Sequence, residues 1–214
     1  QEAARLISDS VIDERALREI YLTGFEIAVK EAQPWTLMSS YNKINGIYAS
    51  SHKELMTNVP RGEWGFEGGI VTDWGGMSDR VEGIEAGVDL EMPAFGDATD
   101  KMIVEAIKAG TITESQLDDS AIRMTAIALL GAKNVSTPFD VEKHHELARR
   151  IARESAVLLK KGTALPASKS DKVALIGEFA VTPRYQGAGS SKIDPTHITS
   201  VSDSFKEHGI DFTY

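Results

Sequence analysis

The 214-residue sequence contains no cysteine, which excludes disulfide bonds, thiol nucleophiles and thiolate metal ligands from this chain. It has no uninterrupted apolar run of about 18 residues, the length that a membrane-spanning helix needs. Positive charge is also scarce: 23 Lys and Arg stand against 32 Asp and Glu, for a net charge of −9. Nucleic acids and anionic membranes attract clustered Lys and Arg, so we expect neither as a partner.

Histidine is sparse as well. The five His residues show neither a His-x-x-x-His nor a His-Glu-x-x-His pattern, so no metal site is expected. The glycine-rich loop at 187–190 lacks the spacing of a phosphate-binding loop, and no cofactor is expected. The sequence does not fix the compartment, because a cysteine-free protein can function in any of them. The cytoplasm is slightly favoured over secretion.

Hydrophobic residues make up 42% of the sequence, enough for a sizeable core in one large domain or parts of two. The first residue is Gln1 rather than a Met or a secretion signal, and the strand-like run at 210–214 stops as it begins. We therefore expect the sequence to be an excerpt from a longer protein.

Short apolar runs predict strands over 35–40, 69–73 and 88–92. Between and after them the pattern predicts helices: one over 52–58 that ends before Pro60, one over 81–86 closed by Gly87, and one that starts at the capping box Thr113–Gln116. Asp13 is expected to cap an earlier helix. Near the end of the sequence the pattern predicts a helix over 145–160 and a buried strand over 172–177. Strands that alternate with helices indicate parallel βαβ units. A barrel and a doubly wound sheet both fit this pattern.

The most informative segment is 68–76, where a short apolar run ends in Asp73, Trp74 follows, and paired glycines lie on both sides. An acidic residue at the carboxyl end of a parallel strand points to the edge where such folds keep their chemistry. Asp also caps helices frequently. The local pattern alone leaves both roles open.

Three blocks in the sequence are Trp-Thr-Leu-Met-Ser-Ser-Tyr-Asn-Lys-Ile-Asn-Gly at 35–46, Thr-Asp-Trp-Gly at 72–75 and Gly-Val-Asp-Leu-Glu-Met-Pro at 87–93. In order, spacing and identity they resemble glycoside hydrolase family 3, of the β-glucosidase type. The resemblance runs from Gln1 to about Phe205. It implies an α/β fold: the C-terminal part of a (β/α)8 TIM-like barrel over 1–133, a linker over 134–142, and the start of an α/β sandwich domain over 143–214.

The resemblance implies a retaining β-glycosidase that hydrolyses terminal, non-reducing β-D-glucosyl residues, with Asp73 as the nucleophile. Retention needs two carboxyl groups roughly 5–5.5 Å apart, one that attacks and one that donates a proton. In the family the acid/base is a Glu supplied by the second domain, and no Glu in this sequence matches it. Glu91 lies close to Asp73 in the pattern, but we expect it to anchor a loop or the barrel interior.

The resemblance also implies substrate-binding residues. Tyr41 and Met38 match residues beside the nucleophile, and Trp74 matches an aromatic wall at the substrate entrance. Arg5 ends a block, Gln1–Arg5, that resembles the family's sugar-binding Asn-Gln-Glu-x-x-Arg motif. The plainer roles are core positions for Tyr41 and Met38 and a surface ion pair for Arg5.

Other functions stay open at this stage. A β-xylosidase, α-L-arabinofuranosidase, β-N-acetylglucosaminidase or phosphorylase could share this fold, and so could a non-catalytic sugar-binding paralogue. An aldolase-like barrel enzyme would need a Schiff-base Lys at a strand end, where the predicted strands have none. The expected partner is a β-glucoside or oligosaccharide substrate, and a homodimer is compatible with the sequence.

Overall fold

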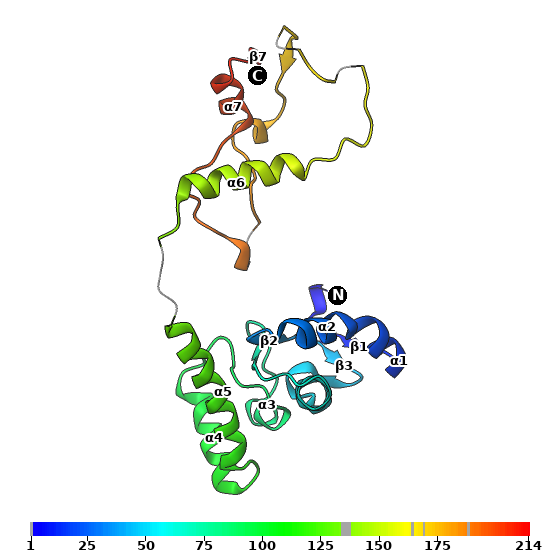
Figure 1. Ribbon diagram of the computed structural model, residues 1–214, viewed down its shortest axis with the longest axis vertical. Helices are drawn as coiled ribbons and strands as arrows, with labels where there is room; N and C mark the ends of the chain where they lie inside the picture. The colour runs from blue at the N-terminus through cyan, green and yellow to red at the C-terminus, as the bar shows by residue number, and fades with distance from the viewer. Residues whose placement is uncertain (1, 134–137, 164, 169, 188) are drawn as a thin grey trace. The chain divides into compact units, whose positions relative to one another are not determined.

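The computed structural model describes residues 2–133, 138–163, 165–168, 170–187 and 189–214 (Figure 1). The chain divides into two compact units, Gln1–Thr137 and Pro138–Tyr214. We treat each unit by itself. The expected linker over 134–142 begins at residues 134–137, which lie outside the described residues.

The first unit contains both helices and strands. In chain order its elements are η1 (Glu2–Ala4), β1 (Asp9–Ser10), α1 (Glu14–Ala16), η2 (Leu17–Tyr21), α2 (Thr23–Ala32), β2 (Thr36–Ser39), β3 (Lys43–Ile44), β4 (Ile47–Tyr48), η3 (Ala49–Ser51), η4 (Glu54–Glu63), β5 (Gly69–Thr72), α3 (Arg80–Ala86), α4 (Asp97–Ala109) and α5 (Glu114–Ala132). The elements η1 and η3 are 3₁₀ helices, whereas η2 and η4 are π-helices.

Strands β2 and β5 pair in parallel, with Met38 opposite Val71 and Ser39 opposite Thr72. This confirms the predicted strands at 35–40 and 69–73. The predicted strand at 88–92 is much shorter, because only Leu90 forms a parallel bridge, to Val71. The three segments nevertheless run side by side in the order β2, β5, Leu90, as parallel βαβ units require.

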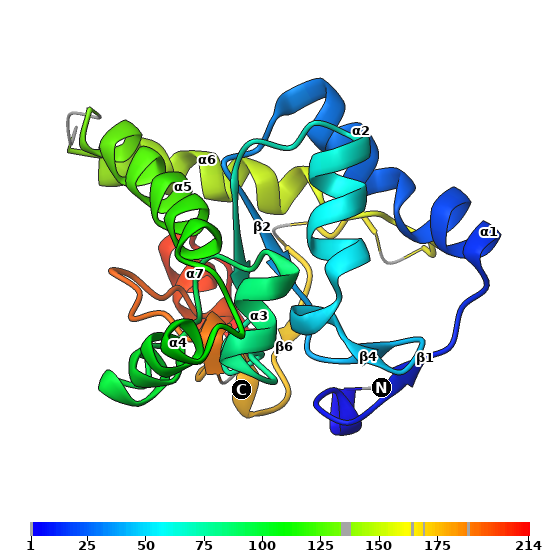
Figure 2. The ribbon, with the colours of Figure 1, turned by 90° about the horizontal axis from the view of Figure 1, so that it is seen from below.

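One face of the β2–β5 pair is covered by helices. Ile70 is buried in a core cluster with Val29, Val59, Trp64, Phe66 and Val88, and Leu37 packs against that cluster. Figure 2 shows η4, in cyan, and α5, in green, on the two flanks of these strands. Residues alternate across a strand, so Thr36 and Met38 lie on the opposite face, where both are exposed.

Local signals place most helix ends correctly. The Asp13 carboxylate accepts from the Ala16 N–H at the start of α1, and Thr113 and Gln116 form the predicted capping box of α5. Gly87 ends α3 with φ of 99°, a left-handed conformation that favours glycine.

The predicted helix end before Pro60 is wrong, because η4 continues through this residue to Glu63. Proline has no N–H to donate, but its carbonyl still accepts from the Phe66 N–H at 2.8 Å. The wider turns of a π-helix leave room for the proline ring. Pro60 is buried, so its ring adds to the packing of this layer.

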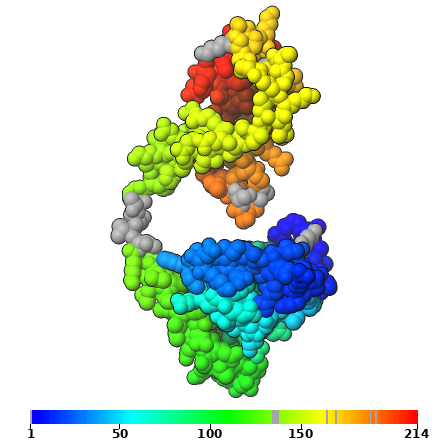
Figure 3. All heavy atoms as spheres, turned by 45° about the vertical axis from the view of Figure 1, so that its right-hand side comes forward, coloured from blue at the N-terminus to red at the C-terminus, as the bar shows by residue number. Residues whose placement is uncertain are grey.

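A small second sheet joins the start of the unit to the segment after β2. Strand β1 pairs in parallel with β3, and β3 pairs antiparallel with β4 around Asn45–Gly46. Both turn residues have positive φ, 52° and 89°, as a two-residue hairpin of this type requires. In Figure 3 the dark-blue start of the chain lies against this segment.

The second unit contains α6 (Val141–Glu154), β6 (Val173–Ala174), η5 (Glu178–Ala180), η6 (Gly189–Ser191), α7 (Val201–Glu207) and β7 (Phe212–Thr213). Strand β6 pairs in parallel with β7. A helix and a short strand thus form where the sequence pattern predicts them, near 145–160 and 172–177. Both are shorter than the pattern indicates.

Candidate active site

Asp73 lies directly after β5, at the carboxyl end of the parallel pair. Its N–H donates to the Ser39 carbonyl at 3.2 Å, which extends the ladder between the two strands by one residue. Asp73 is half-buried. Because side chains alternate along a strand, Asp73 lies on the same face of β5 as Val71. Met38 is the residue of β2 opposite Val71. The carboxylate is therefore accessible on the face that the helices do not cover.

The two oxygens of the Asp73 carboxylate have different surroundings. Oδ1 accepts from the Tyr41 hydroxyl at 2.7 Å and from the Trp74 N–H at 2.6 Å. Within the described part of the chain, no group donates to Oδ2. A carboxylate held by one oxygen keeps the lone pairs of the other available for attack or for a ligand.

A tight turn at 73–76 fixes this carboxylate. The Gly76 N–H donates to the Asp73 carbonyl at 2.9 Å and the Gly75 N–H to the Met92 carbonyl at 2.7 Å. Gly75 has φ of 79°, which the third position of a type II turn requires. A Cβ on Gly76 would lie 3.2 Å from the Asp73 carbonyl oxygen and 3.4 Å from Tyr41 Cδ1. The second glycine pair thus allows the turn and the close approach of Tyr41.

Tyr41 connects the strand ends. Its hydroxyl lies 2.7 Å from Asp73 Oδ1 and 3.0 Å from the Trp74 carbonyl oxygen. Donation to the Asp73 carboxylate raises the pKa of the Tyr41 phenol above its usual value of about 10. The phenol therefore keeps its proton, and can donate, at neutral pH.

The other predicted substrate residues lie around this pair. Arg5 Cζ is 4.5 Å from the centroid of the Tyr41 ring, and Arg5 Nη1 is 2.8 Å from Glu2 Oε1. The Trp74 N–H donates to Asp73 Oδ1, and the Trp74 carbonyl accepts from the Tyr41 hydroxyl. Trp74 is 65% exposed. Met38 is 60% exposed. The structure brings Arg5, Tyr41, Asp73 and Trp74 together by direct contacts, and Met38 shares their sheet face.

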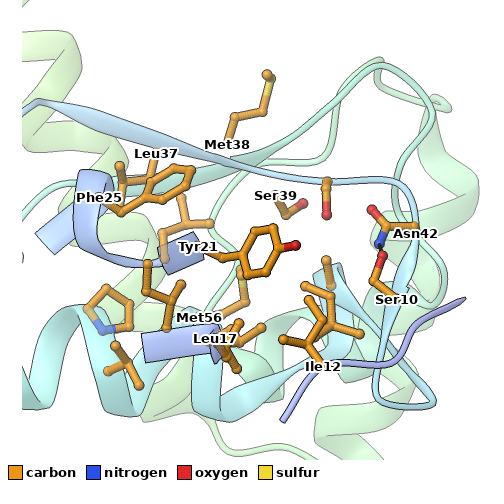
Figure 4. Close-up of a pocket in the computed structure, with 18 of the residues that line it drawn as sticks. Ser10, Ile12, Leu17, Tyr21, Phe25, Leu37, Met38, Ser39, Asn42 and Met56 are labelled. Atoms are coloured by element: carbon orange, nitrogen blue, oxygen red, sulfur yellow. Dashed lines mark hydrogen bonds between the residues drawn. The ribbon is translucent and has the colours of Figure 1, made fainter. Parts of the chain in front are cut away.

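A cavity of about 370 Å³ lies elsewhere, between β2 and the helices η2, α2 and η4. Its walls are mainly hydrocarbon, and Asp73 does not line it. Figure 4 shows Tyr21 and Leu17 directed into this cavity and Met38 directed away from it, on the other side of β2. A sugar needs several polar partners, so this cavity is not the candidate sugar site.

The sequence profile of the glycosyl hydrolase family 3 N-terminal domain matches residues 8–127, more than half of the chain. The chain belongs to glycoside hydrolase family 3. It is 46% identical to the thermostable β-glucosidase B of Acetivibrio thermocellus, over 99% of this chain and 28% of that protein. It is also 46% identical to an exo-α-(1→6)-L-arabinopyranosidase of Bifidobacterium breve, over 98% of this chain and 29% of that protein.

The crystal structure of the family 3 β-glucosidase from Bifidobacterium adolescentis superimposes with a TM-score of 0.88 at 46% identity. The match covers the whole of this chain and 32% of that one. The chain has the mixed helix and strand fold of the family's N-terminal domain and spans about a third of the length of these relatives.

The sequence pattern did not reveal a buried ionic cluster in this family 3 domain. The Asp89 side chain is fully buried and bridges Arg61 and Arg123 at 2.9 and 2.7 Å. It also accepts from the Ile70 N–H at 2.7 Å and the Ser120 hydroxyl at 2.8 Å. The charged Asp89 within the apolar run Gly-Val-Asp-Leu could have predicted this cluster, because a buried charge needs partners.

Glu91 is also buried, and its Oε2 lies 3.8 Å from Arg80 Nε. This burial and this contact fit the expectation that Glu91 anchors a loop or the interior. Burial lowers the pKa of the Arg80 guanidinium.

Within the described residues, no group of three or more His, Asp and Glu is arranged to hold a metal ion. None of the helices described is long and apolar enough to cross a membrane.

Proposed function

We propose that the full-length protein is a retaining β-glycosidase that hydrolyses terminal β-D-glucosyl residues, with Asp73 as its nucleophile. The observation that carries this proposal is the asymmetric carboxylate of Asp73, held through Oδ1 at the carboxyl end of β5. The identity to a β-glucosidase over nearly the whole chain supports the same reaction.

The proposed mechanism has two displacements. Asp73 Oδ2 forms a bond to the anomeric carbon while the bond from that carbon to the leaving oxygen breaks. A Glu outside this sequence protonates the leaving oxygen and then takes a proton from the attacking water. Water displaces Asp73 from the opposite side, so the product keeps the β configuration. Neither displacement requires a cofactor or a metal.

The chain's own residues have distinct proposed roles. Tyr41 stabilises the negative charge that returns to Asp73 when the intermediate breaks down. Trp74 and Met38 provide an apolar wall for the C–H face of the sugar. Arg5 is close enough to this group to contact sugar hydroxyls with the guanidinium nitrogens that Glu2 does not occupy.

We further propose the domain organisation. The parallel order β2, β5, Leu90, with functional residues at the strand ends, fits the C-terminal part of a (β/α)8 barrel over 1–133. The linker would occupy 134–142, and an α/β sandwich domain would begin at 143. The division of the chain near residue 137 supports this boundary.

A second candidate substrate follows from the arabinopyranosidase relative, which is as similar to this chain as the β-glucosidase. The same two-displacement chemistry on an arabinopyranoside would use Asp73 and Tyr41 in the same way. The kinetics of full-length protein with aryl β-D-glucoside and aryl α-L-arabinopyranoside substrates would distinguish the two.

Replacing Tyr41 with Phe tests the proposed site. This change removes the O–H that donates to Asp73 Oδ1 but keeps the ring and the Trp74 N–H. A hydrogen bond to a charged group contributes about 1.5–3 kcal/mol, so kcat should fall about 10- to 150-fold. Steady-state kinetics of the full-length protein would measure the loss.

The matched control is Tyr48→Phe in the neighbouring hairpin. The Tyr48 hydroxyl that this change removes donates to the Leu6 carbonyl at 3.3 Å. We expect this variant to keep nearly the wild-type kcat. Equal rates in Tyr41→Phe and wild type would contradict the proposed role of the Tyr41 hydroxyl beside the Asp73 carboxylate.

A further inference from the structure

The Tyr41 ring is held on more than one side. The Gly76 backbone approaches the ring so closely that a Cβ there would lie 3.4 Å from Tyr41 Cδ1. The Arg5 guanidinium carbon lies 4.5 Å from the ring centroid, within the range of a cation–π interaction. The phenol hydroxyl at the end of this ring reaches Asp73 Oδ1.

We propose that Arg5 is a positioning residue that acts through Tyr41: its guanidinium, stacked on the ring, holds the phenol where its hydroxyl donates to Asp73. This role differs from a contact with sugar hydroxyls, because it operates before any sugar binds. Its consequence for turnover rests on the proposed function, but its effect on Tyr41 does not.

The phenol hydroxyl has one proton and two acceptors, Asp73 Oδ1 at 2.7 Å and the Trp74 carbonyl at 3.0 Å. Small rotations of the ring would change how that proton is shared. Arg5 itself is restrained by Glu2, which takes one guanidinium nitrogen. The planar guanidinium of Arg suits this stacking better than the ammonium of Lys.

The charges around the phenol give a measurable signature. Asp73 and Glu2 raise the pKa of Tyr41, whereas the Arg5 cation lowers it because it stabilises the phenolate. Replacing Arg5 with Lys keeps a positive charge beside the phenol but loses the planar group that stacks on its ring. A phenol that no longer donates to Asp73 loses the interaction that raises its pKa most, so its ionisation should move to lower pH. A residue that only contacts sugar would leave this ionisation unchanged in the absence of ligand.

The first experiment measures that ionisation directly. A fluorinated tyrosine at position 41, which ionises at lower pH than tyrosine, would be followed by ¹⁹F NMR in the full-length, sugar-free protein. We expect Arg5→Lys, which keeps the charge and loses the stacking, to shift the ionisation to lower pH. Two controls should leave it in place: Arg15→Gln removes a similar exposed ion pair, and Lys43→Gln removes the cation 4.9 Å from the Tyr48 ring. An unchanged ionisation in Arg5→Lys would overturn the proposal.

The second experiment is a double-mutant cycle on kcat. A cation–π contact at a partly exposed site corresponds to roughly a 2- to 5-fold effect, so Arg5→Gln alone should lower kcat by about that factor. In the Tyr41→Phe background, which has no hydroxyl to position, Arg5→Gln should have no further effect on kcat. Equal losses in both backgrounds, or a change confined to KM, would show that Arg5 does not act through Tyr41.

If the protein hydrolyses no glycoside, the proposed function fails, and the NMR result still decides whether Arg5 acts on Tyr41.

Discussion

Asp73→Ala is expected to abolish turnover by the full-length protein, with a loss in kcat on the order of 10³-fold or more. The nucleophile is removed, but the fold should persist because Asp73 is half-exposed and has no ion-pair partner among the described residues. Circular dichroism would verify folding. Asp97→Ala, at an exposed carboxylate on α4 with 87% of its side chain accessible, is the matched control and should keep full activity.

Azide should restore slow cleavage of an activated aryl β-glucoside by Asp73→Ala, because the anion fits the space left by the carboxylate. Proton NMR of the anomeric signal would show an α-configured azide product from the variant and a β-configured sugar from the wild type. A single displacement replaces two in the variant, which accounts for the inversion. Asp73→Asn should be inactive and still bind sugar, since an amide keeps the shape but cannot attack.

The second large effect concerns stability. Asp89→Ala leaves Arg61 and Arg123 without the fully buried carboxylate that bridges them. Breaking a buried ionic cluster from one side destabilises a protein by about 3–5 kcal/mol. The midpoint of urea unfolding, followed by circular dichroism, should therefore fall clearly below that of the wild type.

The control for this effect is Asp118→Ala, at an exposed position on the same helix as Arg123. A surface change of this kind should alter stability by less than about 0.5 kcal/mol. Equal unfolding midpoints for Asp89→Ala and Asp118→Ala would mean that the buried cluster contributes little to the fold.

Short-range patterns predicted much of the first unit. The caps at Asp13 and Thr113, the left-handed Gly87 and the strands that become β2 and β5 depend on neighbouring residues, which the sequence displays directly. The π-helix through Pro60 was missed, because proline normally ends an α-helix and the sequence does not signal wider turns.

The site was predictable in its residue types but not in its contacts. Tyr41 and Asp73 are 32 positions apart, and Asp89 meets Arg123 across 34. Strand ends indicate which residues gather at one edge, but register and rotamers decide which atoms meet. The resemblance to the family suggested a sugar contact for Arg5, whereas its stacking on Tyr41 emerged only from the structure.

The most direct test of the central claim is to trap the covalent intermediate. The probe is a 2-deoxy-2-fluoro derivative of the glycoside that the protein hydrolyses, and it carries a good leaving group. The full-length protein would be incubated with this probe, digested and analysed by mass spectrometry. Fluorine next to the anomeric carbon slows both displacements, and the activated leaving group lets the first outpace the second, so the intermediate accumulates. Our account predicts one added sugar on the peptide that contains Asp73. A sugar attached to any other carboxylate would contradict it.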